Sequence, residues 1–118
     1  MTLDEYFGDQ VLSRQLFDAL YNMVTEICPV ELRVTKSQVA FVAEKTFAWV
    51  WMPGKYLHGK VAPLVLTLVL HYRNPSPRWK EIVEPSPGNY THHLELFSIN
   101  DIDGQVRNWL QEAWSNQA

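Results

Sequence analysis

Residues 89–97 read NYTHHLELF, which places two adjacent histidines and a glutamate in a segment of strand-forming residues. Imidazole and carboxylate groups can bind a metal ion or transfer a proton. Neighbouring side chains of a strand point to opposite faces of its sheet, so His92 and His93 cannot easily share one ion. We predict that His92 lies on the apolar, helix-covered face, and that His93 and Glu95 lie on the other face.

A metal site would need a third ligand from a neighbouring strand. His71, at the end of the long apolar segment PLVLTLVLHY, is the obvious candidate. Two histidines and one carboxylate would suit zinc or non-haem iron if they converged. Nothing in the spacing of His71, His93 and Glu95 shows that they do. We therefore favour a core-edge histidine and a surface His93–Glu95 pair, and we expect no cofactor.

A second group of polar residues lies in the segment LRVTKSQ, which contains Arg33, Lys36 and Gln38. Cationic and amide groups on an open sheet face can hold a carboxylate or a phosphate. Together with His93 and Glu95, these three are our candidate ligand-binding residues. The alternative is a structural ion pair between Arg33 or Lys36 and Glu95 across neighbouring strands.

The segment FAWVWMP carries an aromatic row, because alternation puts Phe47, Trp49 and Trp51 on one face of a strand. Such a row beside basic residues could stack bases or sugar rings. The other face of this strand is also apolar, so a core position or a homodimer interface explains the row more simply. Trp49 and Trp51 are secondary candidates for ligand binding.

The segment SPRWKEIVEPSPG contributes two more secondary candidates, Arg78 and Lys80, which follow a proline-containing loop. Loops hold functional residues more often than the elements that they connect. The simpler interpretation is a surface connection that its prolines stiffen.

Charge is strongly segregated along the chain, whose net charge is −3. Residues 1–32 hold six acids and one base, and residues 81–118 hold the same numbers, so each segment has a charge of −5. Residues 33–80 hold eight bases and one acid, a charge of +7. Either one face or rim of the molecule is cationic, or the acids and bases interleave and neutralise each other.

Composition indicates a packed globular domain, with 47% hydrophobic and 19% charged residues. One cysteine cannot form an internal disulfide, and we expect a cytoplasmic protein. The N-terminal segment has no apolar run, so we expect no signal peptide. The longest largely apolar segment, APLVLTLVL, is too short to cross a bilayer, so we expect no membrane partner.

Hydrophobic periodicity predicts a single domain, residues 1–118, with the order helix, sheet, helix. A period near 3.6 predicts a helix over residues 10–28, capped by Asp9 and ended by Pro29, with a short helical turn before it. A period of two predicts strands within residues 30–97. A last helix, over residues 101–115, is capped by Asn100 or Asp101. We predict an α+β fold in which both terminal helices pack on one face of an antiparallel sheet of five to six strands.

Several segments resemble a family of short bacterial domains of unknown function, of the DUF5655 type: VTKSQVAF, FAWVWMP, SPRWKEIVEPSPG, THHLEL and DIDGQVRNWLQEAW. The resemblance covers nearly the whole chain and implies a cytoplasmic bacterial domain with no assigned activity. The layout is also similar, more distantly, to small α+β proteins that include a frataxin-like iron-chaperone group. No iron-binding residue can be transferred from that group, and layout does not carry function.

The function that these patterns favour is a non-catalytic binding or interaction module, with no catalytic residues. Its sheet would present a basic, aromatic-rich surface to an anionic small molecule, a protein partner or a second copy of the chain. Nucleic-acid binding through the +7 segment is one alternative, although a pI near 5.7 argues against it. A metal carrier or enzyme around His93 and Glu95 is the other, and the sequence has no nucleophile motif or phosphate loop to support it.

Overall fold

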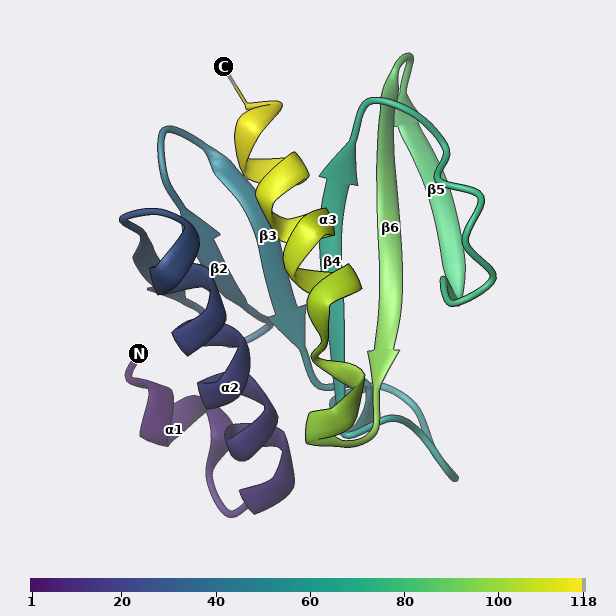
Figure 1. The fold of residues 1–118 in the computed structure, drawn as a ribbon. Helices are drawn as coiled ribbons and strands as arrows, with labels where there is room; N and C mark the ends of the chain where they lie inside the picture. The colour runs from purple at the N-terminus through teal and green to yellow at the C-terminus, as the bar shows by residue number, and fades with distance from the viewer. Residues whose placement is uncertain (118) are drawn as a thin grey trace.

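The computed structural model describes residues 1–117 and consists of one sheet with helices before and after it (Figure 1). The elements, in chain order, are α1 (Leu3–Phe7), α2 (Val11–Ile27), β1 (Glu31–Val34), β2 (Val39–Val42), β3 (Thr46–Trp51), the 3₁₀ turn η1 (Pro53–Lys55), β4 (Leu64–Leu70), β5 (Glu81–Ser86), β6 (Asn89–Leu96), the 3₁₀ turn η2 (Ile99–Asp101) and α3 (Gly104–Ser115).

The six strands form one sheet in the order β1-β2-β3-β4-β6-β5, and every neighbouring pair is antiparallel. The prediction of an α+β fold with one antiparallel sheet is therefore confirmed. Strand β4 lies between β3 and β6, as its apolar side chains on both faces require. Among residues 1–117, no helix combines the length and the apolarity that a membrane span needs.

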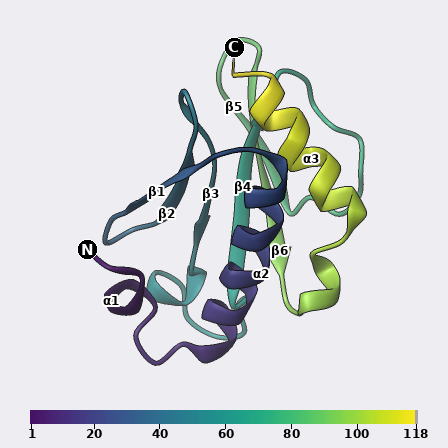
Figure 2. The same cartoon turned by 60° about the vertical axis from the view of Figure 1, so that its left-hand side comes forward.

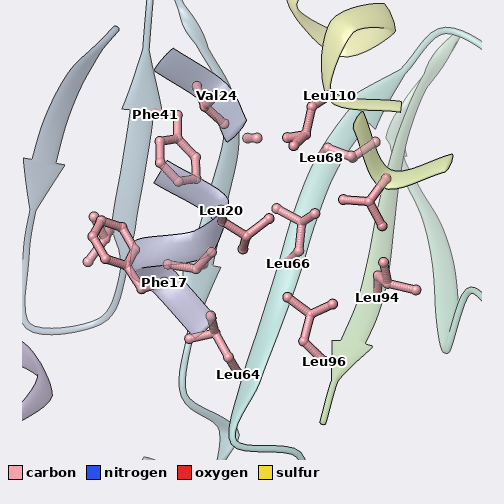
Figure 3. Packing of buried hydrophobic residues seen from close by; sticks show 14 of the residues in the cluster. Phe17, Leu20, Val24, Phe41, Leu64, Leu66, Leu68, Leu94, Leu96 and Leu110 are labelled. Atoms are coloured by element: carbon pink, nitrogen blue, oxygen red, sulfur yellow. The ribbon is translucent and has the colours of Figure 1, made fainter. Parts of the chain in front are cut away.

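Helices α2 and α3 lie across one face of the sheet (Figures 1 and 2). The even-numbered leucines of β4 and β6 point toward them and share one buried cluster with α2 side chains such as Phe17 and Leu20 (Figure 3). The Phe17 and Phe41 rings stack between α2 and β2, with centroids 6.0 Å apart. Strand alternation thus puts one apolar row of each central strand into this core, because side chains two residues apart share a face.

The helix boundaries correct two predicted caps. Helix α2 begins at Val11 with Gln10 as its N-cap residue, and the side chain of Asp9 does not cap it. Helix α3 begins at Gly104, where the Asp103 carboxylate accepts a hydrogen bond from the Val106 N–H. Asp101 instead belongs to the η2 turn, where its carboxylate accepts from the backbone N–H groups of Phe97 and Ser98.

The predicted aromatic row is also corrected at Phe47. The β2–β3 register shifts between Phe41 and Val42, so β3 has one more residue than its partner at this point. Phe47 is 3% exposed and belongs to the helix-side core, whereas Trp49 and Trp51 remain half-buried. A bulge of this kind re-aims a side chain, which alternation alone does not predict.

The corrected caps can be tested by comparing Asp103→Ala with Asp9→Ala. The Asp103 carboxylate caps α3 and pairs with Arg78 at 3.0 Å, so its loss should lower the free energy of unfolding by about 1–2 kcal/mol. Asp9→Ala should change it by less than about 0.5 kcal/mol. Urea unfolding monitored by tryptophan fluorescence measures both, and equal effects of the two variants would contradict the assignment.

Candidate functional site

The face of the sheet opposite α2 and α3, here called the open face, carries the candidate site. Strand pairing aligns one residue of each strand in a row across the sheet. From β1 to β5 the row reads Arg33, Ala40, Trp49, Thr67, His93 and Glu81. It begins with a cation and ends with a carboxylate, so the open face is polarised along the row and not uniformly basic.

A second row lies next to it, toward the loop that joins β3 to β4 (residues 52–63). Trp51 of β3 pairs with Val65 of β4, and Val65 pairs with Glu95 of β6. Val65 and Thr67 are 2% and 0% exposed although they lie on the open face. Side chains on that face therefore cover the middle of the sheet.

A chain of hydrogen bonds joins three side chains of these rows. The Trp51 indole Nε1–H donates to Thr67 Oγ1 over 3.0 Å, and Thr67 Oγ1 lies 2.8 Å from His93 Nδ1. An indole N–H can only donate, so Thr67 accepts from Trp51. The Thr67 hydroxyl is buried. Its O–H would have no acceptor unless His93 Nδ1 accepts a hydrogen bond from it. We therefore assign Nδ1 as the acceptor and place the imidazole proton on Nε2.

His93 Nε2–H has no hydrogen-bond partner among residues 1–117. No buried side-chain nitrogen or oxygen in that range lacks a partner, so this N–H is accessible from outside. Burial lowers the pKa of His93, and the nearby negative charge of Glu81 opposes that effect without reversing it. The imidazole is therefore neutral near pH 7 and presents one N–H donor.

Two adjoining hollows flank Trp51 on the open face. The first has a volume of about 460 Å³ and is bounded by residues that include Gln38, Trp49 and Tyr56. The second, of about 250 Å³, is bounded by Val61 and Val65 and by the polar residues Lys80, Glu81 and Glu95. Trp51, Leu57 and His93 line both hollows. Because these three are shared, we regard the hollows as one candidate site.

The β3–β4 loop borders the site and lies at one end of the sheet (Figure 1). It carries Tyr56 and Leu57, which are 55% and 50% exposed. The Tyr56 and Trp51 rings are 6.4 Å apart and inclined at 54°. The loop is attached to the β1–β2 turn by bonds from Lys55 Nζ and the Tyr56 hydroxyl to the backbone carbonyls of residues 36 and 37.

The polar end of the site holds one ion pair and one unpaired carboxylate. Lys80 Nζ donates to Glu95 Oε2 over 3.2 Å, so these two charges largely compensate each other. Glu81 lies across from His93 in the β5–β6 register and takes part in no ion pair within residues 1–117. The formal charge of this end is therefore −1, which disfavours an anionic group there.

The structure brings together most, but not all, of the residues singled out from the sequence. His93, Glu95, Gln38, Trp49, Trp51 and Lys80 line the site. Arg33 and Lys36 are exposed and line neither hollow. Sequence reasoning missed Thr67, Tyr56, Leu57 and Glu81. Of these four, Thr67 could have been found, because it is a polar residue within the apolar segment LVLTLVL.

Arg78 lies elsewhere and has structural partners. Its guanidinium donates to the Asp103 carboxylate, to Gln105 Oε1 and to the backbone carbonyl of Asp101, and it lies over the Trp109 ring. These contacts attach the loop before β5 to the start of α3. Arg78 is thus engaged on the helix-covered side.

His71, His93 and Glu95 do not come together as metal ligands. His71 follows β4 four residues beyond Thr67, which pairs with His93, so it lies about 13 Å along the strand. It lines a different hollow, at the C-terminal end of α3. Among residues 1–117, no three histidine, cysteine, aspartate or glutamate side chains gather as metal ligands.

His92 lies on the helix-covered face of the sheet, opposite to His93, as strand alternation predicted. It is 0% exposed, accepts a hydrogen bond at Nε2 from the Asn74 N–H, and has Nδ1 3.0 Å from the Tyr90 carbonyl. Its ring lies 4.8 Å from that of Trp79. Both nitrogens of His92 are therefore used within the fold.

Thr67 and His93 have the spacing of a nucleophile and its base, but burial prevents that chemistry. The Thr67 hydroxyl is inaccessible to a substrate, and the bond from the Trp51 indole occupies one of its lone pairs. The chain of bonds can hold the imidazole in place. It cannot deliver the Thr67 hydroxyl to a substrate.

A larger hollow, of about 530 Å³, lies on the other side of the same loop, between it and helices α1 and α2. Its polar groups already have partners: Ser13 Oγ donates to the Pro63 carbonyl over 2.7 Å, and the Lys55 ammonium lies 3.7 Å from the centre of the Tyr6 ring. Burial raises the pKa of Tyr6 to about 12, so its hydroxyl remains a donor to the Ser37 carbonyl. We regard this hollow as part of the packing between the β3–β4 loop and the N-terminal helices.

The molecule is thus an α+β domain whose open sheet face carries an aromatic-walled candidate site with one fixed donor. Residues 4–117 match the model of the domain of unknown function family DUF5655. The chain therefore belongs to the DUF5655 family, and the resemblance inferred from its motifs is confirmed. Searches of curated proteins and of solved structures returned no match to it.

The two histidines should make stability depend on pH. Burial lowers the pKa of both His92 and His93 from 6.5, so the unfolded chain takes up protons first as the pH falls. The free energy of unfolding should therefore be flat above about pH 7.5 and fall as the pH drops through 6.5, by at most about 1.4 kcal/mol per pH unit for each histidine.

Urea unfolding at pH 7.5 and 5.5 measures this loss. His93→Asn keeps an acceptor near the Nδ1 position but cannot be protonated, so it should remove part of the loss. Equal stability of the wild type at both pH values would contradict the assigned burial effects.

Proposed function

We propose that this domain is a non-catalytic binding module that holds a small, planar, uncharged molecule on its open sheet face. The observation that carries the proposal is the arrangement around Trp51. An indole wall, the loop residue Leu57 and the free His93 Nε2–H bound the same two adjoining hollows. Sites for small molecules are typically apolar hollows with a few fixed polar groups.

Planarity follows from the shape of the walls. Trp49, Trp51 and Tyr56 supply aromatic surface on the same side of the sheet, and stacking on such surfaces favours flat rings. Trp51 is held by its bond to Thr67, so it is positioned before a ligand arrives. A pre-positioned wall lowers the entropy cost of binding.

That the ligand is uncharged is inferred from the polar residues of the site. The sequence favoured an anionic ligand, but Arg33 and Lys36 lie outside the hollows and Lys80 is paired with Glu95. What remains toward the ligand is one neutral donor, His93, and one carboxylate, Glu81. These groups suit hydrogen bonding better than neutralisation of an anion.

The proposal predicts that Trp51→Ala lowers the affinity for planar probes at least about fivefold, because stacking on an aromatic side chain contributes about 1–3 kcal/mol per ring. Suitable uncharged probes are indole, phenol, benzamide and guanosine. Isothermal titration calorimetry gives the affinities, and ¹⁵N-resolved NMR shows which residues respond.

The matched control is Tyr72→Ala, which removes an exposed aromatic ring outside both hollows. It should leave the affinities unchanged. Responses confined to Tyr6, Ser13 and Ala62 would move the site to the other side of the loop. If no probe binds at millimolar concentration, the proposal fails.

A further inference from the structure

We infer that the planar molecule is a guanine-type base, recognised by an edge with one carbonyl acceptor beside two N–H donors. This inference rests on the proposed function and specifies its ligand. It depends on the relative placement of His93, Glu81 and Trp51, which come from three different strands.

The donor of the site is His93 Nε2–H, and its chemistry is fixed. Because Nδ1 accepts a hydrogen bond from the Thr67 hydroxyl, the ring hydrogen of the neutral imidazole is on the accessible Nε2. Reversal of the tautomer would leave the buried Thr67 hydroxyl without an acceptor, which is costly. The site therefore selects a ligand with an acceptor, such as a ring carbonyl, at this position.

The acceptor of the site is the Glu81 carboxylate. Glu81 pairs directly with His93 across β5 and β6, where opposed Cβ atoms are about 4.5–5.5 Å apart. It lines the hollow, and its negative charge acts on the His93 ring. Glu95 is engaged by Lys80, so Glu81 is the carboxylate that remains available. An ionised carboxylate only accepts, and it can take two parallel N–H groups.

The wall of the site orients the ring relative to this edge. The imidazole of His93 and the indole of Trp51 have centroids 6.2 Å apart and planes at 88°. A ring that lies flat against the indole is therefore nearly perpendicular to the imidazole plane, and we place its polar edge beside His93 and Glu81. The edge next to His93 and Glu81 should then read acceptor, donor, donor.

Guanine presents a carbonyl oxygen, a ring N–H and an amino group in that order along one edge. Hypoxanthine retains the carbonyl and the ring N–H but lacks the amino group. Adenine has a donor where guanine has its carbonyl, so it would leave both His93 Nε2–H and the Glu81 carboxylate facing the wrong partner. Mismatched polar groups of this kind lose the most affinity when a site excludes water.

The experiment is a calorimetric titration of the full chain with guanosine, inosine, adenosine and indole. Guanosine should bind at least about fivefold more tightly than inosine and at least about tenfold more tightly than adenosine, as expected for the loss of one or more good base contacts. Indole has one N–H donor and no edge acceptor, so it cannot satisfy His93 Nε2–H and reports mainly on the aromatic wall.

Two variants test the edge. Glu81→Gln should lower guanosine affinity at least about tenfold and indole affinity much less, because guanosine offers the carboxylate two parallel N–H groups and indole offers at most one. His93→Asn should weaken guanosine and inosine equally, and His93→Gln, which keeps an N–H near the Nε2 position, should restore part of the loss. Glu44→Gln, at an exposed turn outside the site, is the matched control. Melting temperatures confirm that each variant is folded.

The outcomes separate this inference from the proposed function. If indole binds at Trp51 but guanosine is not preferred over adenosine, or Glu81→Gln has no effect on guanosine, the base assignment is overturned and the planar site remains. If neither indole nor any nucleoside binds, both are overturned. Titrations with the single-stranded trinucleotides AGA and AAA distinguish the source of the base. If AGA binds more tightly than guanosine and the gain in affinity depends on salt, the source is nucleic acid. If AGA and guanosine bind equally tightly, the source is a free nucleoside.

Discussion

The buried hydroxyl of Thr67 constrains the side chains at the centre of the open face. It lies in β4, the strand that is covered on both sides, and is 0% exposed. A buried hydroxyl without partners costs about 1–3 kcal/mol, so the neighbouring strands must supply a donor or an acceptor. Trp51 of β3 and His93 of β6 do so, and their side chains are thereby held in one orientation. The same bonds that satisfy the fold fix an indole wall and an imidazole donor at the surface.

The two adjacent histidines show how far local chemistry depends on the face of the sheet. In His92, Nε2 accepts from the backbone of Asn74, and both ring nitrogens have partners inside the fold. In His93, Nδ1 accepts from Thr67, and Nε2 has no hydrogen-bond partner within residues 1–117. Burial lowers the pKa of both rings. Two identical residues thus become a structural linker and a presented donor because their side chains point in opposite directions from one strand.

Much of this arrangement could be predicted from the sequence, because hydrophobic periodicity reflects burial directly. The period of two placed His92 with the core and His93 with Glu95 on the other face, and the doubly apolar segment PLVLTLVLHY indicated the central strand. Phe47 was placed wrongly because a bulge breaks the alternation. Asp101 was placed wrongly as a cap because Asp103 stands two residues further on and bonds instead, and Asp9 because its side chain makes no capping bond to α2; the local backbone decides both cases.

The site itself depends on strand order, which the sequence does not specify. Glu81 becomes a neighbour of His93 only because β5 returns to the edge beside β6, and Leu57 reaches the site only through the path of the β3–β4 loop. Likewise, the +7 segment suggested a cationic surface, but Arg78 pairs with Asp103 and Lys80 with Glu95, both from the acidic third segment. Interleaving thus reduces the charge that the sequence appeared to concentrate. What the open face presents is a directional pair, a donor at His93 and an acceptor at Glu81, beside an aromatic wall.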